Sequence, residues 1–244
     1  LMTQMTIGHL YTSLHAGCAS AVARVLEAHE VEVEFVDLDP EDIEDALEQG
    51  EVDLLVSAWF PRDEKFSGLG SRVIGDLYQP QISFAALKAL GPVNTLTSAD
   101  VDRVIVADDS REALEKALKQ LPALSALPME VVGEAALIAR LEKAQSEGEA
   151  PLVVATQPHA VFHASLLTLV EDPGQLLGGE MSARMILRED VARKADTDLL
   201  DELSEMMLGN KVMSALDYMI GVEGQDPDEA AEAWQRGRLI PRDA

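Results

Sequence analysis

The sequence predicts an α/β protein of two lobes joined by two crossings. Short β-branched runs alternate with helical stretches, the pattern of parallel strands connected by crossover helices. The alternation occurs twice, over segments of about 80 residues each, the size of a small domain. The tail is too short for a third sheet, so we expect it to complete the first lobe. Lobe 1 then covers residues 1–80 and 178–244, and lobe 2 covers residues 81–177.

The first lobe begins with three predicted strands: Met5–Leu10, Val31–Val36 and Val52–Ala58. Between the first two, Ser13–His29 has apolar residues near a 3.6-residue spacing and is predicted as a helix. The next helix has an N-cap at Asp39, a proline after it and a terminating Gly50. A loop is expected over residues 62–75, and residues 77–92 are interpreted as the first crossing.

The second lobe repeats this order with strands Arg103–Ala107, Met129–Val132 and Leu152–Thr156, and helices Arg111–Leu121 and Glu134–Gln145. Asp109 or Ser110 is expected to cap the first of these helices. After the return crossing, Ser182–Leu187 is predicted as a strand and the rest as helices. The last helix starts at Asp226-Pro227 and ends at Gly237.

Composition excludes several classes of protein. Hydrophobic residues make up 47% of the chain, enough for a folded core, but they form no continuous apolar stretch of the ~20 residues that a membrane-spanning helix needs. The single cysteine, Cys18, excludes an internal disulfide and a multi-cysteine zinc site, and we expect it in the core. The start of the sequence has no secretory leader, which is compatible with a trimmed mature form or with a cytoplasmic protein.

The charge is strongly acidic. The chain has 44 acidic and 19 basic residues and a net charge of −25. Nucleic acids and anionic lipid surfaces bind through Lys and Arg, so neither is an expected partner and no direct membrane insertion is expected. The acidic residues are spread along the chain and indicate a solvated, soluble surface.

Six side chains at predicted strand ends are the candidate ligand-binding residues: Tyr11, Thr12, Ser13, Trp59, Gln157 and His159. We expect them to face a cleft between the lobes, where ligands bind in such folds. Thr12 and Ser13 open a helix whose free amides suit a carboxylate, with an ordinary N-cap as the alternative. Trp59 can stack a ligand or attract a cation, or it can be structural. Gln157 and His159 can hydrogen-bond a polar or anionic ligand.

The sequence contains no recognisable catalytic motif. A nucleophile elbow, a phosphate-binding glycine loop and a defined pair of acids are all missing from it. His159 and His163 have the i, i+4 spacing of some metal sites, but the glutamate of an HExxH motif and a clustered third ligand are lacking. We therefore expect no metal, no cofactor and no enzymatic activity.

Three motifs resemble one family. Ser57-Ala58-Trp59-Phe60-Pro61 with Lys65-Phe66, Gln157-Pro158-His159 followed by Leu167 to Asp172-Pro173, and the final stretch Gly221 to Trp234 occur in this order. They resemble motifs of the glycine betaine/proline betaine/choline substrate-binding proteins of ABC importers. The resemblance implies a type II periplasmic-binding-protein fold that closes on a small ligand and delivers it to a membrane permease, outside the cytoplasm.

The chain also departs from this family. Relatives often have tryptophans flanking the Q-P-H stretch, as part of an aromatic cage for a quaternary ammonium group, where this sequence has Thr156 and Ala160. The ligand is therefore predicted to be a betaine- or choline-like solute or a relative that is less methylated or larger. The alternatives are a cytoplasmic enzyme built on the same fold and a ligand-sensing module.

Overall fold

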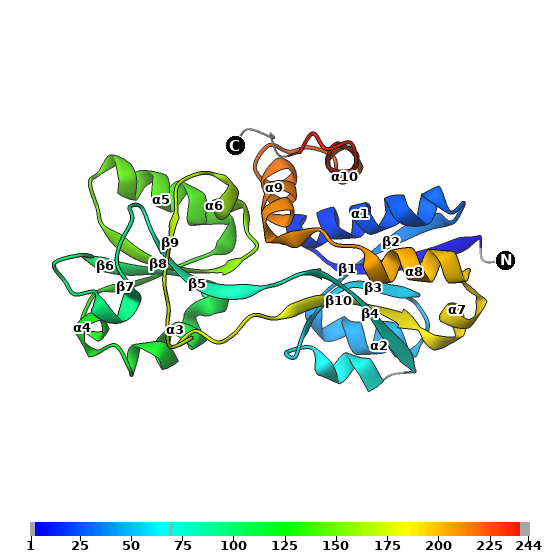
Figure 1. Cartoon of the computed structure of the whole chain (residues 1–244), viewed down its shortest axis with the longest axis horizontal. Coiled ribbons are helices and arrows are strands. Elements are labelled where there is room, and N and C mark those ends of the chain that lie inside the picture. Colours follow the sequence, from blue (N-terminus) through cyan, green and yellow to red (C-terminus); the bar gives the residue numbers. More distant parts are fainter. Residues whose placement is uncertain (1–2, 69, 240–244) are drawn as a thin grey trace. The chain divides into compact units, whose positions relative to one another are not determined.

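A computed structural model describes residues 3–68 and 70–239 (Figure 1). The chain divides into two compact units, residues 1–80 with 181–244 (unit 1) and residues 81–180 (unit 2). Unit 2 thus ends at Glu180, whereas the sequence placed its end at 177. Each unit has its own five-stranded sheet. Within the described ranges, no helix has both the length and the apolar character needed to cross a membrane.

The sheet of unit 1 is mixed and has the strand order β2-β1-β3-β10-β4. Its strands are β1 (Gln4–Leu10), β2 (Glu32–Leu38), β3 (Leu54–Phe60), β4 (Ser71–Tyr78) and β10 (Ser182–Arg188). Strand β1 pairs in parallel with β2 and β3, while β10 pairs antiparallel with β3 and β4. Its α-helices are α1 (Ser13–Ala28), α2 (Ile43–Glu48), α7 (Glu189–Lys194), α8 (Thr197–Glu205), α9 (Gly209–Gly221) and α10 (Pro227–Gln235).

Helices cover both faces of this sheet (Figure 1). On one face α1 packs between the sheet and helices α9 and α10, and the buried Cys18 belongs to that cluster. On the other face α2 contributes Ile43 and Leu47 to a second cluster. At the start of β3 successive residues alternate between the two, with Leu54 and Val56 in the first and Leu55 in the second. This alternation is the period-two geometry of a strand buried on both sides.

Unit 2 has strand order β7-β6-β8-β5-β9. Its strands are β5 (Gln81–Ala86), β6 (Arg103–Ala107), β7 (Met129–Val132), β8 (Pro151–Gln157) and β9 (Thr168–Val170). Its α-helices are α3 (Arg111–Leu118), α4 (Pro122–Ser125), α5 (Leu137–Ser146) and α6 (Ala160–His163). Strands β7, β6 and β8 are parallel, and β5 pairs antiparallel with β8 and β9.

The short 3-10 helices are η1 (Pro40–Asp42), η2 (Glu64–Gly68), η3 (Val93–Thr95), η4 (Asp108–Ser110) and η5 (Glu134–Ala136). Asp39 is at the N-cap position and Pro40 begins the first turn, as predicted, although the Asp39 side chain makes no cap hydrogen bond. Ser110 is at the N-cap position of α3, and its side chain makes no cap hydrogen bond either. The caps at Thr12 and Asp226 are confirmed, since their side chains accept hydrogen bonds from the backbone N–H groups of His15 and Asp228.

The α/β architecture and the predicted strands are present, but the prediction for residues 62–75 is wrong. The expected loop runs into β4, which begins at Ser71. The chain passes from unit 1 to unit 2 between Pro80 and Gln81, within the stretch 77–92 interpreted as the first crossing, and that stretch also contains the end of β4 and all of β5. Gly75, with a φ of 78°, interrupts the alternation of β4, so periodicity did not reveal this strand.

Candidate functional site

In unit 1, three of the predicted residues line one pocket of about 600 Å³. Tyr11, Thr12 and Ser13 form the turn from β1 into α1, and the Tyr11 side chain is 77% exposed. The remaining lining residues are His9, Ala16, Ser20, Phe35, Asp37, Ile220, Asp226, Pro227 and Asp228. The pocket therefore combines exposed aromatic surface with carboxylates, a setting that suits a cationic group.

Two histidine contacts order the end of β1 beside this pocket. His9 Nδ1 lies 2.9 Å from the Leu10 carbonyl oxygen, and His9 Nε2 lies 3.2 Å from Asp37 Oδ1. Phe35, on the neighbouring strand, packs edge-on against the His9 ring with centroids 6.1 Å apart. His9 and Asp37 face each other because β1 and β2 pair in parallel with these two residues in register.

The hydroxyl groups of Thr12 and Ser13 are both used inside unit 1. Thr12 Oγ1 accepts a hydrogen bond from the His15 backbone N–H at 3.2 Å. Ser13 Oγ donates to Asp217 Oδ1 on α9 at 2.8 Å. The N-cap interpretation of Thr12 is thus confirmed. The Thr12 backbone N–H also donates to the Leu10 carbonyl oxygen at 2.9 Å, so ligand binding at this helix end stays a prediction that falls on the Ser13 backbone amide.

Trp59 is the penultimate residue of β3 and is buried, with 7% of its surface exposed. Its Nε1–H donates to the Tyr78 hydroxyl at 2.9 Å, and Ser57 Oγ lies 2.7 Å from the same oxygen. The His15 ring stacks on Trp59 with centroids 5.9 Å apart and planes at 26°. Protein side chains therefore surround this indole, and its role in stacking a ligand stays a prediction.

His15 has the strongest electrostatic perturbation near Trp59. Burial, followed by the positive charges of His9 and Arg62, lowers the His15 pKa to about 4, and the Asp63 charge opposes this effect only partly. Among the described residues His15 Nδ1 has no hydrogen-bond partner. The imidazole is therefore neutral near pH 7 and acts as a flat, mostly apolar surface against the indole.

In unit 2, Gln157 ends β8 and His159 caps α6. Gln157 Nε2 donates to Ser83 Oγ at 3.0 Å, and His159 Nδ1 accepts from the Val161 backbone N–H at 2.9 Å. The neutral His159 ring then carries its hydrogen on Nε2. Because His159 precedes the helix, His159 and His163 do not form an i, i+4 pair on one helical face.

Thr156 and Ala160, at the positions flanking Gln157-Pro158-His159, are both buried. Thr156 is 8% exposed, and its hydroxyl lies 3.1 Å from Ser110 Oγ and 3.5 Å from Asp109 Oδ2. Ala160 is 5% exposed. This part of unit 2 thus presents hydroxyl and carboxylate groups at the ends of β6 and β8 in place of aromatic rings.

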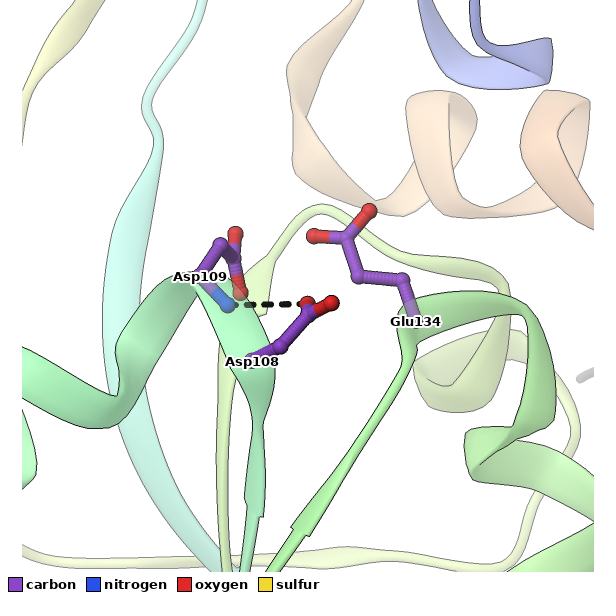
Figure 2. Close-up of side chains that lie close together, drawn as sticks. All are labelled: Asp108, Asp109 and Glu134. Atoms are coloured by element: carbon purple, nitrogen blue, oxygen red, sulfur yellow. Dashed lines mark hydrogen bonds between the residues drawn. The ribbon is translucent and has the colours of Figure 1, made fainter.

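An acidic cluster lies at the same strand ends (Figure 2). Asp108 and Asp109 form the start of η4 after β6, and Glu134 starts η5 after β7. Their carboxylate oxygens lie within 4.8 Å of one another, and the Asp109 N–H donates to Asp108 Oδ1 at 2.9 Å. The spacing is compatible with a cation, although exposed acidic groups are common without one. All three side chains are exposed.

Sequence reasoning missed several residues of these sites. His15 and Arg62 lie against Trp59, yet His15 lies inside a helix and Arg62 in an ordinary charged turn. Arg62 directly follows the Ser57 to Pro61 motif, so the motif itself could have drawn attention to it. The acidic cluster was not anticipated, because first-turn acids also occur as simple helix-dipole partners.

Comparison with solved structures shows the fold. Lactococcal OpuAC, in a closed, liganded conformation with glycine betaine, is 18% identical, with coverage of 97% of this chain and 98% of that chain and a TM-score of 0.74. Apo YehZ from Escherichia coli is 14% identical, with coverage of 98% and 100% and a TM-score of 0.76. The glycine betaine/L-proline-binding protein ProX from Borrelia burgdorferi is 17% identical, with coverage of 98% and 97% and a TM-score of 0.70.

These likenesses confirm the type II periplasmic-binding-protein fold that the motifs implied. No curated protein sequence matches the chain. A family model does match, over residues 83–236, and it describes the substrate binding domain of ABC-type glycine betaine transport systems. Because this match covers more than half of the 244 residues, the chain belongs to the family of substrate-binding domains of ABC-type glycine betaine transport systems.

Proposed function

We propose that this protein is the substrate-binding component of an ABC importer and captures a betaine- or choline-like compatible solute. The family match over residues 83–236 carries the proposal. It is supported by solved structures of similar fold that were determined with glycine betaine and with choline. In this role the protein binds a small molecule reversibly and performs no chemistry on it.

We assign ligand contacts to residues of both units. In unit 1 these are Tyr11, Trp59, and Thr12 and Ser13 at the start of α1, and in unit 2 they are Gln157 and His159. The Thr12 backbone N–H already donates to the Leu10 carbonyl oxygen, so the donor we assign at this helix end is the Ser13 backbone N–H. The helix end suits a ligand carboxylate, because unpaired first-turn amides and the helix dipole favour negative charge. The exposed ring of Tyr11 suits the ligand's cationic group.

The ligand is proposed to be less methylated than glycine betaine, or larger. The hydroxyl of Thr156 and the carboxylate of Asp109 occur near positions where relatives often carry tryptophan. A carboxylate or hydroxyl accepts hydrogen bonds from an N–H group, whereas a trimethylammonium group has no N–H to donate. An ammonium group that retains an N–H would therefore form hydrogen bonds with these acceptors that a trimethylammonium group cannot form.

The importer's membrane permease is the proposed partner, and the proposed location is outside the cytoplasm. Membership of the family, which is described as the substrate binding domain of ABC-type transport systems, supports both. The acidic surface agrees with a protein that diffuses freely and avoids anionic lipid.

A ligand series measured by thermal unfolding tests this function. Glycine betaine, dimethylglycine, choline, carnitine, dimethylsulfoniopropionate and the amino acids are each added in excess. A true ligand at a hundred times its Kd stabilises the folded protein by about 2.7 kcal/mol, so at least one quaternary or less methylated amine is expected to raise the Tm.

Variants then locate the site. Gln157→Ala and His159→Ala are expected to reduce the ligand-induced rise in Tm, while Gln145→Ala, which removes an exposed amide on α5, retains it. If no amine in the series changes the Tm of the unaltered protein, the proposed ligand class is wrong. A rise that Gln157→Ala and His159→Ala leave intact would move the site elsewhere.

A further inference from the structure

A guanidinium group of the protein itself packs against the face of the Trp59 ring. Arg62 Cζ lies over the ring, 4.6 Å from its centroid. This distance is well inside the ~6 Å limit of a cation–π contact, and tryptophan is the aromatic residue that binds cations best. The contact is local, since Arg62 is three residues after Trp59 in the turn that follows β3.

Asp63 holds the arginine in this position. Its carboxylate accepts two hydrogen bonds from Arg62, from Nε at 3.1 Å and from Nη2 at 2.8 Å. The same carboxylate accepts the Trp59 backbone N–H at 2.7 Å. One acidic side chain thus ties the guanidinium and the tryptophan backbone together, which fixes the cation relative to the ring.

Other side chains of the protein contact the rest of the indole. His15 stacks on Trp59, and Tyr78 accepts its Nε1–H. Only 7% of the residue is exposed, so the aromatic surface available to another group is small. A second cation cannot approach the ring where Arg62 lies without moving it.

The arginine is nevertheless able to leave. Its side chain is 52% exposed, so solvent hydrates the guanidinium once it swings away. Exposed ion pairs such as Arg62–Asp63 contribute little to stability, and long side chains change rotamer readily. The Arg62 charge is close enough to lower the pKa of the buried His15, which is further evidence that it acts within this cluster.

We infer that Arg62 is a resident cation on Trp59 that competes with the positive group of the ligand and so sets the affinity of the site. The inference rests on the proposed function, in which Trp59 is one of the ligand contacts, and it adds that the Trp59 ring contacts the cationic part of the amine solute. A ligand's ammonium group gains its contact with the indole only by displacing the guanidinium, and the lost Arg62 contact weakens net binding.

The covering of Trp59 is tested first, without a ligand. The sequence has two tryptophans, and all proteins in this test carry Trp234→Phe, so that the fluorescence comes from Trp59 alone. Arg62→Gln is compared with Arg72→Gln, which removes the same charge from a different ion pair of unit 1, with Glu189. Acrylamide quenching of Trp59 fluorescence is expected to increase in Arg62→Gln and to stay unchanged in Arg72→Gln.

Competition is tested next, by titration of the same proteins with glycine betaine, choline, dimethylglycine and carnitine. An exposed cation–π contact is weak, so its removal from the free protein is expected to tighten binding about two- to fivefold in Arg62→Gln. Arg62→Lys retains a cation and is expected to bind closer to the unaltered protein. Equal or weaker binding by Arg62→Gln would overturn the inference.

The two tests separate the inference from the proposed function. Unchanged quenching in Arg62→Gln shows that the guanidinium does not cover the ring and overturns the inference whatever the ligand is. If no variant binds any of the four amines, the proposed function fails for these amines and the competition fails with it, while the quenching still reports whether Arg62 covers Trp59. A thermal unfolding curve for each variant confirms that it is folded.

Discussion

His15 illustrates how strongly the position of one side chain determines its chemistry. The ring is 5% exposed, stacks on Trp59 and has a pKa of about 4 instead of 6.5, mainly through burial. Nearby, burial also raises the pKa of the Tyr78 hydroxyl, which accepts the indole N–H. His15 and Tyr78 are therefore both uncharged near pH 7, and Arg62 is the cation in contact with the indole.

The lowered pKa of His15 predicts a pH dependence of stability. Between pH 6.5 and pH 4 the unfolded chain binds a proton at His15 that the folded protein does not, so stability falls as the pH falls. The full effect is about 3 kcal/mol. His15→Phe keeps an aromatic ring on Trp59 and removes the titrating group, so its free energy of unfolding is expected to fall less steeply over this range.

Urea unfolding at several pH values measures this difference. Val22→Ala, a core substitution on the same helix that removes no titrating group, is expected to follow the slope of the unaltered protein. If the free energies of unfolding of His15→Phe and the unaltered protein differ by the same amount at every pH, the prediction is contradicted.

At the scale of residues, the sequence predicted the position of a residue within a strand or helix better than the burial of its side chain. Tyr11 and Thr12 occur at a strand end, as expected, because β1 and α1 are local structures. The burial of Trp59 could not be predicted, since it depends on His15 and Tyr78, which lie on other elements. The ligand-binding role of all six candidate residues stays a prediction.

At the scale of elements, the pairing of β1 with its neighbours depends on one residue without a side chain. Gly8 lies opposite Val36 of β2 and Leu55 of β3. A Cβ atom at this position would come within 2.8 Å of Val52 Cγ2 and 2.9 Å of Leu38 Cδ1. Both neighbours are buried, so neither can move aside freely.

We therefore expect Gly8→Ala to destabilise the protein by about 1–3 kcal/mol, the range for overpacking a core. Gly133→Ala is the matched control, because a Cβ there meets nothing within 4 Å. Chemical denaturation of both variants gives the comparison. Equal stabilities would mean that the sheet adapts to the added methyl group.

The predicted elements failed where local patterns were weakest. Strands β6 and β7 have the predicted bounds, because each is a short run containing β-branched residues between residues that interrupt it: Asp102 and Asp108 for β6, and Pro128 and Gly133 for β7. Strands β4, β5 and β9 were not predicted. They pair antiparallel with strands from distant parts of the sequence, so their stability comes from partners rather than from their own periodicity.

For the whole molecule, charge is the dominant collective property. The net charge of −25 is carried by 44 acidic and 19 basic residues. Each unit has its own buried core, so folding concentrates this charge on the surface of both. Like charges on a compact surface repel one another, and salt screens the repulsion.

Added salt is therefore expected to stabilise the protein. Raising NaCl from about 0.01 M to about 0.15 M shortens the Debye length from ~30 Å to ~8 Å, so the Tm should rise. A variant with the four exposed acids of the η1–α2 segment neutralised should respond less to salt: Glu41→Gln, Asp42→Asn, Glu44→Gln and Asp45→Asn. Calorimetry checks both, and a Tm that falls with salt would contradict the prediction.

The sequence by itself determined the α/β class, the order of most elements, the acidic surface and the motifs shared with a known family. These are properties of local composition and periodicity. Tertiary structure decided the antiparallel edges of both sheets, the burial of Trp59 beneath His15 and Arg62, and the meeting of Asp108, Asp109 and Glu134. Contacts between segments created these features, and a single local pattern does not encode which segments meet.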